Sequence, residues 1–205
     1  MAEARYSICV LASGNGSTMQ AIVDACRTGY LNGSVVAVVS DNPGAYALKR
    51  AREAGIQAVV IDRKGLTQAE FDAKLLSFLR RIGPDIICLA GFLRILPSGI
   101  VNEFNRRILN IHPSLLPKYG GKGMYGIRVH RAVIENRERV SGCTVHIVTE
   151  NVDDGPVILQ RKVDVLPGDT PESLMERVHA EELKAYPEAI KTLMEGSGSV
   201  QQRIA

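Results

Sequence analysis

The chain has 205 residues and a formal net charge of +3, with 45% hydrophobic and 23% charged residues. This balance is ordinary for a folded globular protein and excludes the disordered and fibrous classes. The small positive charge contains no long run of lysine or arginine, so we expect no nucleic-acid partner, while small anionic ligands remain compatible. No apolar run is long enough to span a membrane and no signal-peptide pattern opens the chain, so we expect a cytoplasmic protein without a membrane partner.

The cysteines and histidines are scattered through the chain. Cysteines occur at Cys9, Cys26, Cys88 and Cys143, far apart and without a C-x-x-C pair. They are predicted to be reduced, buried thiols. The four histidines also lack the paired spacing of metal ligands, so no metal site is expected.

Strand-like and helix-like segments alternate through the first half of the chain. In order, the predicted segments are strand 7–12, a helix that follows the glycine-rich loop 14–18, strand 35–40, helix 45–54, strand 58–61, helix 68–81 and strand 85–90. Repeated alternation of this kind predicts an α/β fold with a doubly wound, mostly parallel, Rossmann-like sheet.

The pattern changes in the second half. The predicted segments are a short helix after 98–99, strand 108–112, a helix near 129–136, strands 143–149 and 157–165, a final long helix from Thr170 to about Glu195, and a frayed tail at 196–199. The last two strands are expected to form an antiparallel pair. No repeat or linker marks a boundary, so 1–205 is predicted to be a single domain, with a phosphate- or nucleotide-binding half at 1–100 and a catalytic half at 101–195.

The loop Gly14-Asn15-Gly16-Ser17-Thr18 joins a strand to the start of a helix. Free backbone N–H groups and the helix dipole favour an anion there, and phosphate is the natural occupant. A purely structural tight turn explains two glycines equally well. A dinucleotide-binding loop, with Asp41 as the ribose-binding acid, requires a third glycine where this chain has Met19.

Asn110 and His112 are separated by one residue at the end of a predicted strand. Their side chains are therefore expected on the same face. If a chain reversal brings Asp153 to them, the three groups suit acyl transfer by direct attack of an amine: Asn110 and protonated His112 would stabilise the oxyanion, and Asp153 would hold His112 charged and assist proton transfer. For each residue alone, a turn or a hydrogen-bonded core position is the simpler interpretation.

Four segments together carry a family resemblance: 13–17, 90–96, 109–119 and 152–160. Over nearly the whole chain they resemble the phosphoribosylglycinamide formyltransferase family, which consists of folate-dependent enzymes of purine synthesis. The run Asn-x-His-Pro-Ser-Leu-Leu-Pro is shared by the wider group of folate formyltransferases, so it indicates the chemistry and not the substrate.

The resemblance implies a formyltransferase domain that uses 10-formyltetrahydrofolate as co-substrate, without a metal, and formylates the amine of phosphoribosylglycinamide. Catalysis is implied for Asn110, His112 and Asp153, and a monomer or homodimer is compatible. The implied ribonucleotide contacts are Gly16, Ser17 and Thr18 at the phosphate and Glu182 at the amine end. The implied folate contacts, mostly in the half 101–195, are Leu93, Arg94, Ile95, Leu96, Asn110, Thr149, Glu150, Asn151, Val152 and Asp153.

The chain departs from the family pattern at Thr18, where many members have Asn, at Gln68, where some have Arg, and in a longer glycine-rich stretch at 120–126. No site residue is assigned in that stretch. The alternatives are a formyltetrahydrofolate hydrolase or another folate formyltransferase, a dinucleotide-dependent oxidoreductase, and a nucleotide-binding regulatory module without catalysis.

Overall fold

A computed structural model describes residues 5–200 of the chain. The chain divides into two compact units, Met1–Leu109 and Asn110–Ala205. None of the helices within residues 5–200 is long and apolar enough to cross a bilayer. The organisation of 1–205 as a single domain stays a prediction.

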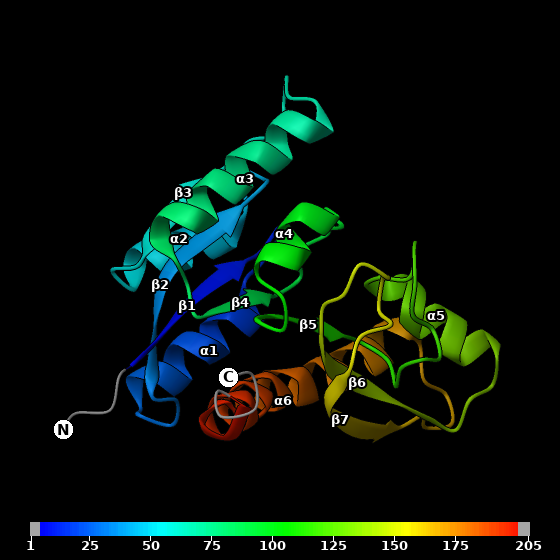
Figure 1. The fold of residues 1–205 in the computed structure, drawn as a ribbon. Helices are drawn as coiled ribbons and strands as arrows, with labels where there is room; N and C mark the ends of the chain where they lie inside the picture. The colour runs from blue at the N-terminus through cyan, green and yellow to red at the C-terminus, as the bar shows by residue number, and fades with distance from the viewer. Residues whose placement is uncertain (1–4, 201–205) are drawn as a thin grey trace. The chain divides into compact units, whose positions relative to one another are not determined.

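The first unit contains the predicted alternation of strands and helices (Figure 1). Its elements are β1 (Tyr6–Leu11), α1 (Ser17–Arg27), β2 (Gly33–Ser40), α2 (Tyr46–Glu53), β3 (Gln57–Val60), α3 (Gln68–Ile82), β4 (Ile86–Leu89) and α4 (Ser98–Glu103), followed by the start of β5 (Ile108–His112).

The strands of the first unit follow the order β3-β2-β1-β4, and the pairs β1–β2, β1–β4 and β2–β3 are all parallel. Helices α1 and α2 contact each other, and Figure 1 shows α1 and α3 on opposite faces of the strands. Both faces of the central strand β1 are covered, which explains why Ile8, Val10 and Leu11 are completely buried. The prediction of a doubly wound parallel sheet is confirmed.

The second unit begins within β5 and is organised differently. It contains α5 (Ile127–Glu135), β6 (Val140–Ile147), β7 (Val157–Asp164) and α6 (Pro171–Val200), with strand order β5-β6-β7. Strands β6 and β7 pair antiparallel, as predicted, and α6 packs against both strands and against α5. The expected antiparallel pair and the final long helix are therefore present.

Several boundaries differ from the predictions by one to a few residues, most clearly the start of β6 and the end of α6. Strand β6 begins at Val140 and not at residue 143, because Val140 to Gly142 continue the ladder opposite Asp164 to Lys162 of β7. The tail predicted at 196–199 is wrong, since α6 continues to Val200. Glycine and serine lower helix propensity by about 0.5–1 kcal/mol per residue, which weakens a helix end without dictating where it stops.

All four cysteines are free, and Cys9, Cys88 and Cys143 are buried as predicted, while Cys26 is partly exposed. Burial raises the pKa of Cys9 to about 12 and, as the main cause, that of Cys143 to about 12. These thiols are packing groups and not nucleophiles, because the reactive thiolate is suppressed at neutral pH.

Candidate active site

The end of β5 carries Asn110 and His112 in the second unit. Asn110 is half-buried and His112 is buried, with 4% of its surface exposed. The period-two geometry of a strand places the two side chains on the same face, with Ile111 turned to the other. The amide and the imidazole therefore share one wall, as the spacing predicted.

Asp153 reaches this wall from the loop that joins β6 to β7. Its backbone adopts a left-handed conformation with φ of 57°, which Asp tolerates better than most residues. The loop is tightly closed: Ile147 N donates to Pro156 O over 2.9 Å, and a Cβ at Gly155 would lie 1.8 Å from Ile147 O. Only glycine fits at 155, and the closed loop carries Asp153, two residues earlier, next to β5.

The Asp153 carboxylate lies between the two predicted partners. Its Oδ2 is 3.4 Å from His112 Nδ1, and its Oδ1 accepts a hydrogen bond from Asn110 Nδ2 over 3.4 Å. Gly121 N also donates to Oδ2 over 3.0 Å. Asn110 and His112 thus converge with Asp153, which follows about forty residues later in the chain, in one largely buried cluster.

A second histidine, His146 on β6, belongs to the same cluster. Its Nε2 lies 3.1 Å from Asn110 Nδ2 and 3.6 Å from Asp153 Oδ1. Its Nδ1 lies 3.0 Å from Ile147 O, which can only accept, so Nδ1 carries a proton. The Asn110 amide nitrogen can only donate, so it donates to His146 Nε2. His146 therefore orients the Asn110 amide.

The orientation of His112 is set by the chain just after β5. Its Nε2 lies 2.8 Å from the carbonyl oxygen of Tyr119, so this nitrogen is the donor. The other nitrogen, Nδ1, faces Asp153 Oδ2 over 3.4 Å. Protonation there produces an imidazolium directly beside a carboxylate.

The electrostatic environment keeps Asp153 ionised. Burial by itself raises the pKa of this carboxyl, but contact with His146, the proximity of His112 and the Gly121 N–H together hold the pKa of Asp153 below its ordinary value. The cluster consequently offers an anionic proton acceptor, a titratable ring and an amide donor. These are the groups required to stabilise a tetrahedral oxyanion and to remove a proton from an attacking amine.

Sequence reasoning missed three members of this cluster: His146, Tyr119 and Gly121. His146 stands between Val145 and Ile147 in an apolar strand, which is the pattern of a core histidine. Tyr119 and Gly121 contribute only backbone atoms. Such contacts do not require a particular side chain, so the residue types in the sequence do not reveal them. The glycine-rich stretch to which no residue was assigned therefore supplies one hydrogen bond to Asp153.

The glycine loop lies in the first unit, as predicted, between β1 and α1. Gly16 is the N-cap residue, with φ of 78°, and no side chain caps the helix. The first turn of α1 contains no acidic residue, so nothing anionic competes for its N–H groups. Thr18 is buried, with 8% of its surface exposed.

Asp41 has a partner that the dinucleotide interpretation did not foresee. Ser13 Oγ donates to Asp41 Oδ1 over 2.7 Å, and Leu93 N donates to Ser13 Oγ over 3.2 Å. Asp41 thus ties the end of β1 to the end of β2 and is already hydrogen-bonded.

The segment 93–96 that follows β4 presents a mixed surface. Leu93 and Ile95 are exposed, with 65% and 53% of their surfaces accessible, whereas Leu96 is buried. Arg94 stacks on the ring of Phe71, 4.5 Å from its centroid, and donates to Gln68. The predicted folate segment therefore places two apolar side chains in solvent.

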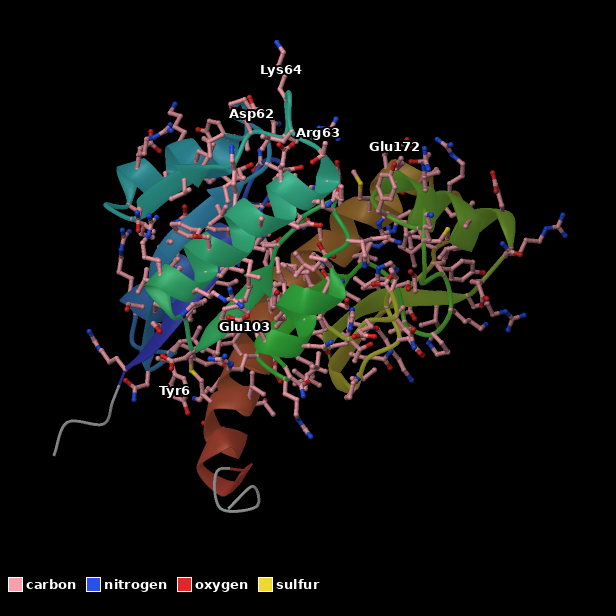
Figure 2. The ribbon with its side chains drawn as sticks, turned by 45° about the horizontal axis from the view of Figure 1, so that its top comes forward. Tyr6, Asp62, Arg63, Lys64, Glu103 and Glu172 are labelled. Atoms are coloured by element: carbon pink, nitrogen blue, oxygen red, sulfur yellow. The ribbon has the colours of Figure 1, made fainter. Side chains whose placement is uncertain are left out.

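Leu93 and Arg94 also line a cavity of about 790 Å³ in the first unit. The loop after β3 forms another part of its wall, and Figure 2 shows Asp62, Arg63 and Lys64 gathered on that loop, with Lys64 projecting outward. The cavity thus has a charged wall and an apolar wall.

The loop segment 149–153 is held by its own polar side chains. Thr149 Oγ1 donates to Asn151 O over 3.2 Å, and Asn151 Nδ2 donates to Asp154 Oδ2 over 3.3 Å. Val152 is exposed. The segment thus has a defined shape next to Asp153.

Glu181 and Glu182 have different surroundings on α6. Glu181 forms ion pairs with Arg161 and Lys184, over 3.1 Å and 2.6 Å. Glu182 accepts a hydrogen bond from His179 Nδ1 over 2.8 Å, and this contact raises the pKa of His179. Within the described residues, Glu181 is thus paired with lysine and arginine, whereas the ion pair of Glu182 is with a histidine.

Comparison with known proteins gives a consistent result. The chain matches the formyl transferase family over residues 6–190. It is 42% identical to phosphoribosylglycinamide formyltransferase of Escherichia coli (strain K12), over 97% of this chain and 92% of that protein. It is also similar to the crystal structure of glycinamide ribonucleotide transformylase 1 from Symbiobacterium toebii, with a TM-score of 0.88, 46% identity, and coverage of 94% and 89% of the two chains.

A longer relative contains a similar region. The chain is 41% identical to part of the trifunctional purine biosynthetic protein adenosine-3 of Drosophila melanogaster; all of this chain aligns, but it spans only 15% of that protein.

Proposed function

Because the chain belongs to the formyl transferase family, we propose that it transfers a formyl group from 10-formyltetrahydrofolate to the amine of N1-(5-phospho-D-ribosyl)glycinamide in purine biosynthesis. The observation that carries the proposal is the convergence of Asn110, His112 and Asp153 in one buried cluster. We place the activity in the cytoplasm, in a monomer or homodimer.

The reaction begins with attack of the glycinamide amine on the formyl carbon, which produces a tetrahedral centre with a negatively charged oxygen. Asn110 has two amide hydrogens. One is donated to His146 over 3.1 Å, and the other is directed to Asp153 over the longer distance of 3.4 Å. The longer, weaker bond is the one that turns to the oxyanion, while His146 holds the amide plane.

Protonated His112 provides a second source of positive charge. Its Nε2 remains bonded to the Tyr119 carbonyl, so only the Nδ1 side changes partner during the reaction. Asp153 stabilises the imidazolium and accepts the proton that the amine loses, directly or through water. Collapse of the tetrahedral centre breaks the bond to the folate nitrogen, which takes up a proton and leaves as tetrahydrofolate.

The remaining contacts follow the family pattern. The ribonucleotide phosphate binds to Gly16, Ser17 and Thr18, a role that the uncapped start of α1 supports. Thr18 contributes its backbone N–H, since its side chain is buried. Glu182 binds the amine end of the ribonucleotide.

The folate contacts are proposed on two segments. The exposed apolar side chains of Leu93 and Ile95 suit a flat heterocycle, and Arg94 and Leu96 complete this segment. Residues 149–153, with Asn110, supply the polar contacts.

Formyl transfer measured with and without phosphoribosylglycinamide tests the proposal. A transferase releases tetrahydrofolate only when the ribonucleotide is present. Release at the same rate without it would instead establish the hydrolase, and no release in either reaction would refute both.

A further inference from the structure

Helix α2 rests directly on the glycine loop of the first unit. Ala47 N donates to Gly14 O over 3.1 Å. A Cβ at Gly16 would lie only 2.6 Å from Ala47 Cβ. The first turn of α2 is therefore packed directly against the loop at Gly14 and Gly16.

Arg50, one turn further along α2, donates two hydrogen bonds to the same loop. Its Nε donates to Asn15 O over 3.0 Å, and its Nη2 donates to Asn15 Oδ1 over 3.1 Å. Both acceptors belong to one residue, so the planar guanidinium fixes the position of the backbone and of the side chain of Asn15 together. Tyr46 supports this orientation, because the guanidinium carbon of Arg50 lies 5.0 Å from the centre of its ring.

Within residues 5–200, no carboxylate forms an ion pair with Arg50. Its two hydrogen bonds to Asn15 go to neutral oxygens, and the ion pair within α2 joins Lys49 to Glu53 over 3.8 Å. The first turn of α1 also carries no acid. A full positive charge thus stands one residue away from the segment 16–18.

We propose that Arg50 is a positioning residue for the ribonucleotide phosphate, a role that rests on the proposed phosphate site. By holding Asn15, it keeps the loop in the one conformation in which the N–H groups at the start of α1 converge on an anion. Its charge adds long-range attraction for a phosphate dianion. Arg50 therefore helps the site to distinguish the phosphorylated ribonucleotide from the unphosphorylated ribonucleoside.

The test is titration calorimetry of purified full-length protein with three probes: phosphoribosylglycinamide, its unphosphorylated ribonucleoside, and inorganic phosphate. Arg50→Gln should weaken ribonucleotide binding about 10-fold, because an ordered loop and a nearby charge are lost together. Binding of the ribonucleoside and the KM for 10-formyltetrahydrofolate should change less than about 2-fold. Arg50→Lys keeps the charge but loses the paired geometry, so an intermediate loss of about 3-fold is expected.

Arg52→Gln is the matched control. Arg52 lies on the same helix, is exposed, and its substitution removes the same charge. It should leave ribonucleotide binding within about 2-fold of the original value, because surface charges at a distance are screened by salt.

Asn15→Ala supplies a second route to the same conclusion. It removes only the side-chain acceptor of Arg50. In the Asn15→Ala background, Arg50→Gln should cost less than it does alone, since one of its two bonds is already absent. If Arg50→Gln folds poorly, the coupling between Arg50 and Asn15 can still be measured, because Arg50→Lys can be compared in the original and in the Asn15→Ala background.

Equal effects of Arg50→Gln and Arg52→Gln would overturn the role of Arg50, as would an equal loss for ribonucleotide and ribonucleoside. Either result, in a protein that still turns over, leaves the proposed function intact. Failure of the unsubstituted protein to bind the ribonucleotide or phosphate would instead refute the phosphate site, and the role of Arg50 with it.

Discussion

The catalytic cluster provides chemistry through side chains, whereas the glycine loop acts through its backbone. The cluster consists of side chains from three separate segments, and its chemistry lies in the imidazole of His112, the amide of Asn110 and the carboxylate of Asp153. The loop consists of backbone, and at Gly16 even a methyl group would collide with Ala47. The cluster should therefore be sensitive to the loss of single functional atoms, and the loop to added volume.

This difference also determines what a substitution reports. In the cluster, isosteric changes remove chemistry without disturbing the fold. In the loop, the same size of change alters backbone geometry, so stability and binding are expected to change together.

The largest effect is expected for Asp153→Asn. The amide keeps the shape but cannot accept a proton or balance an imidazolium, so kcat should fall by about 10³-fold or more. Steady-state kinetics give this value, and thermal unfolding should show a folded protein. Near-native turnover would remove Asp153 from the mechanism.

His112→Ala should lower kcat by on the order of 10²-fold or more, while the affinities for both substrates change much less, because the ring acts mainly on the transition state. Comparison of kcat with directly measured binding separates the two contributions. A loss confined to KM would make His112 a binding residue.

Gly16→Ala should destabilise the protein by more than about 2 kcal/mol, because a left-handed backbone costs about 1–2 kcal/mol and the clash with Ala47 adds to it. Urea denaturation measures the loss, and the KM for the ribonucleotide should rise in the same variant.

Gly29→Ala is the matched control: its φ of 76° is nearly the same as the 78° of Gly16, but no atom lies within 4 Å of the added carbon. It should cost only about 1 kcal/mol and leave KM unchanged. Equal losses would show that conformation, and not contact with α2, requires glycine at 16.

The smallest effect is expected for His130, which makes the stability of the protein depend on pH over a defined range. Burial, with a smaller contribution from His112, lowers the pKa of His130 from 6.5 to about 4, and its Nδ1 has no hydrogen-bond partner among the described residues. The unfolded chain takes up a proton below pH 6.5, whereas the folded protein does not until about pH 4. Stability is therefore complete above pH 6.5 and is lost as the pH falls, by about 2 kcal/mol at pH 5.

His130→Leu should remove this loss, as measured by urea denaturation between pH 7 and pH 4.5. His179→Gln is a control of opposite sign, since a raised pKa stabilises the folded state at low pH and loses that effect as the pH rises. If the stability of His130→Leu fell with decreasing pH as steeply as that of the unsubstituted protein, His130 would not be the cause of the loss.

Much of the fold was readable from the sequence because local patterns are strong in the first unit. Thr67 and Glu70 form the capping box that starts α3: Glu70 N donates to Thr67 Oγ1, and Thr67 N donates to the Glu70 carboxylate. Boundaries were less accurate where pairing decides them, as at Val140, whose place in β6 depends on β7 and not on its own neighbours in sequence.

The sequence by itself determined the order of strands and helices, the shared face of Asn110 and His112, and the position of the glycine loop, because these follow from periodicities of a few residues. Only the tertiary structure decided that Asp153 reaches His112, that His146 orients the Asn110 amide, and that Arg50 grips Asn15. These contacts join residues 35 to 41 positions apart. Such pairs are set by closure of loops and packing of whole elements, and no local pattern records which side chains will then meet.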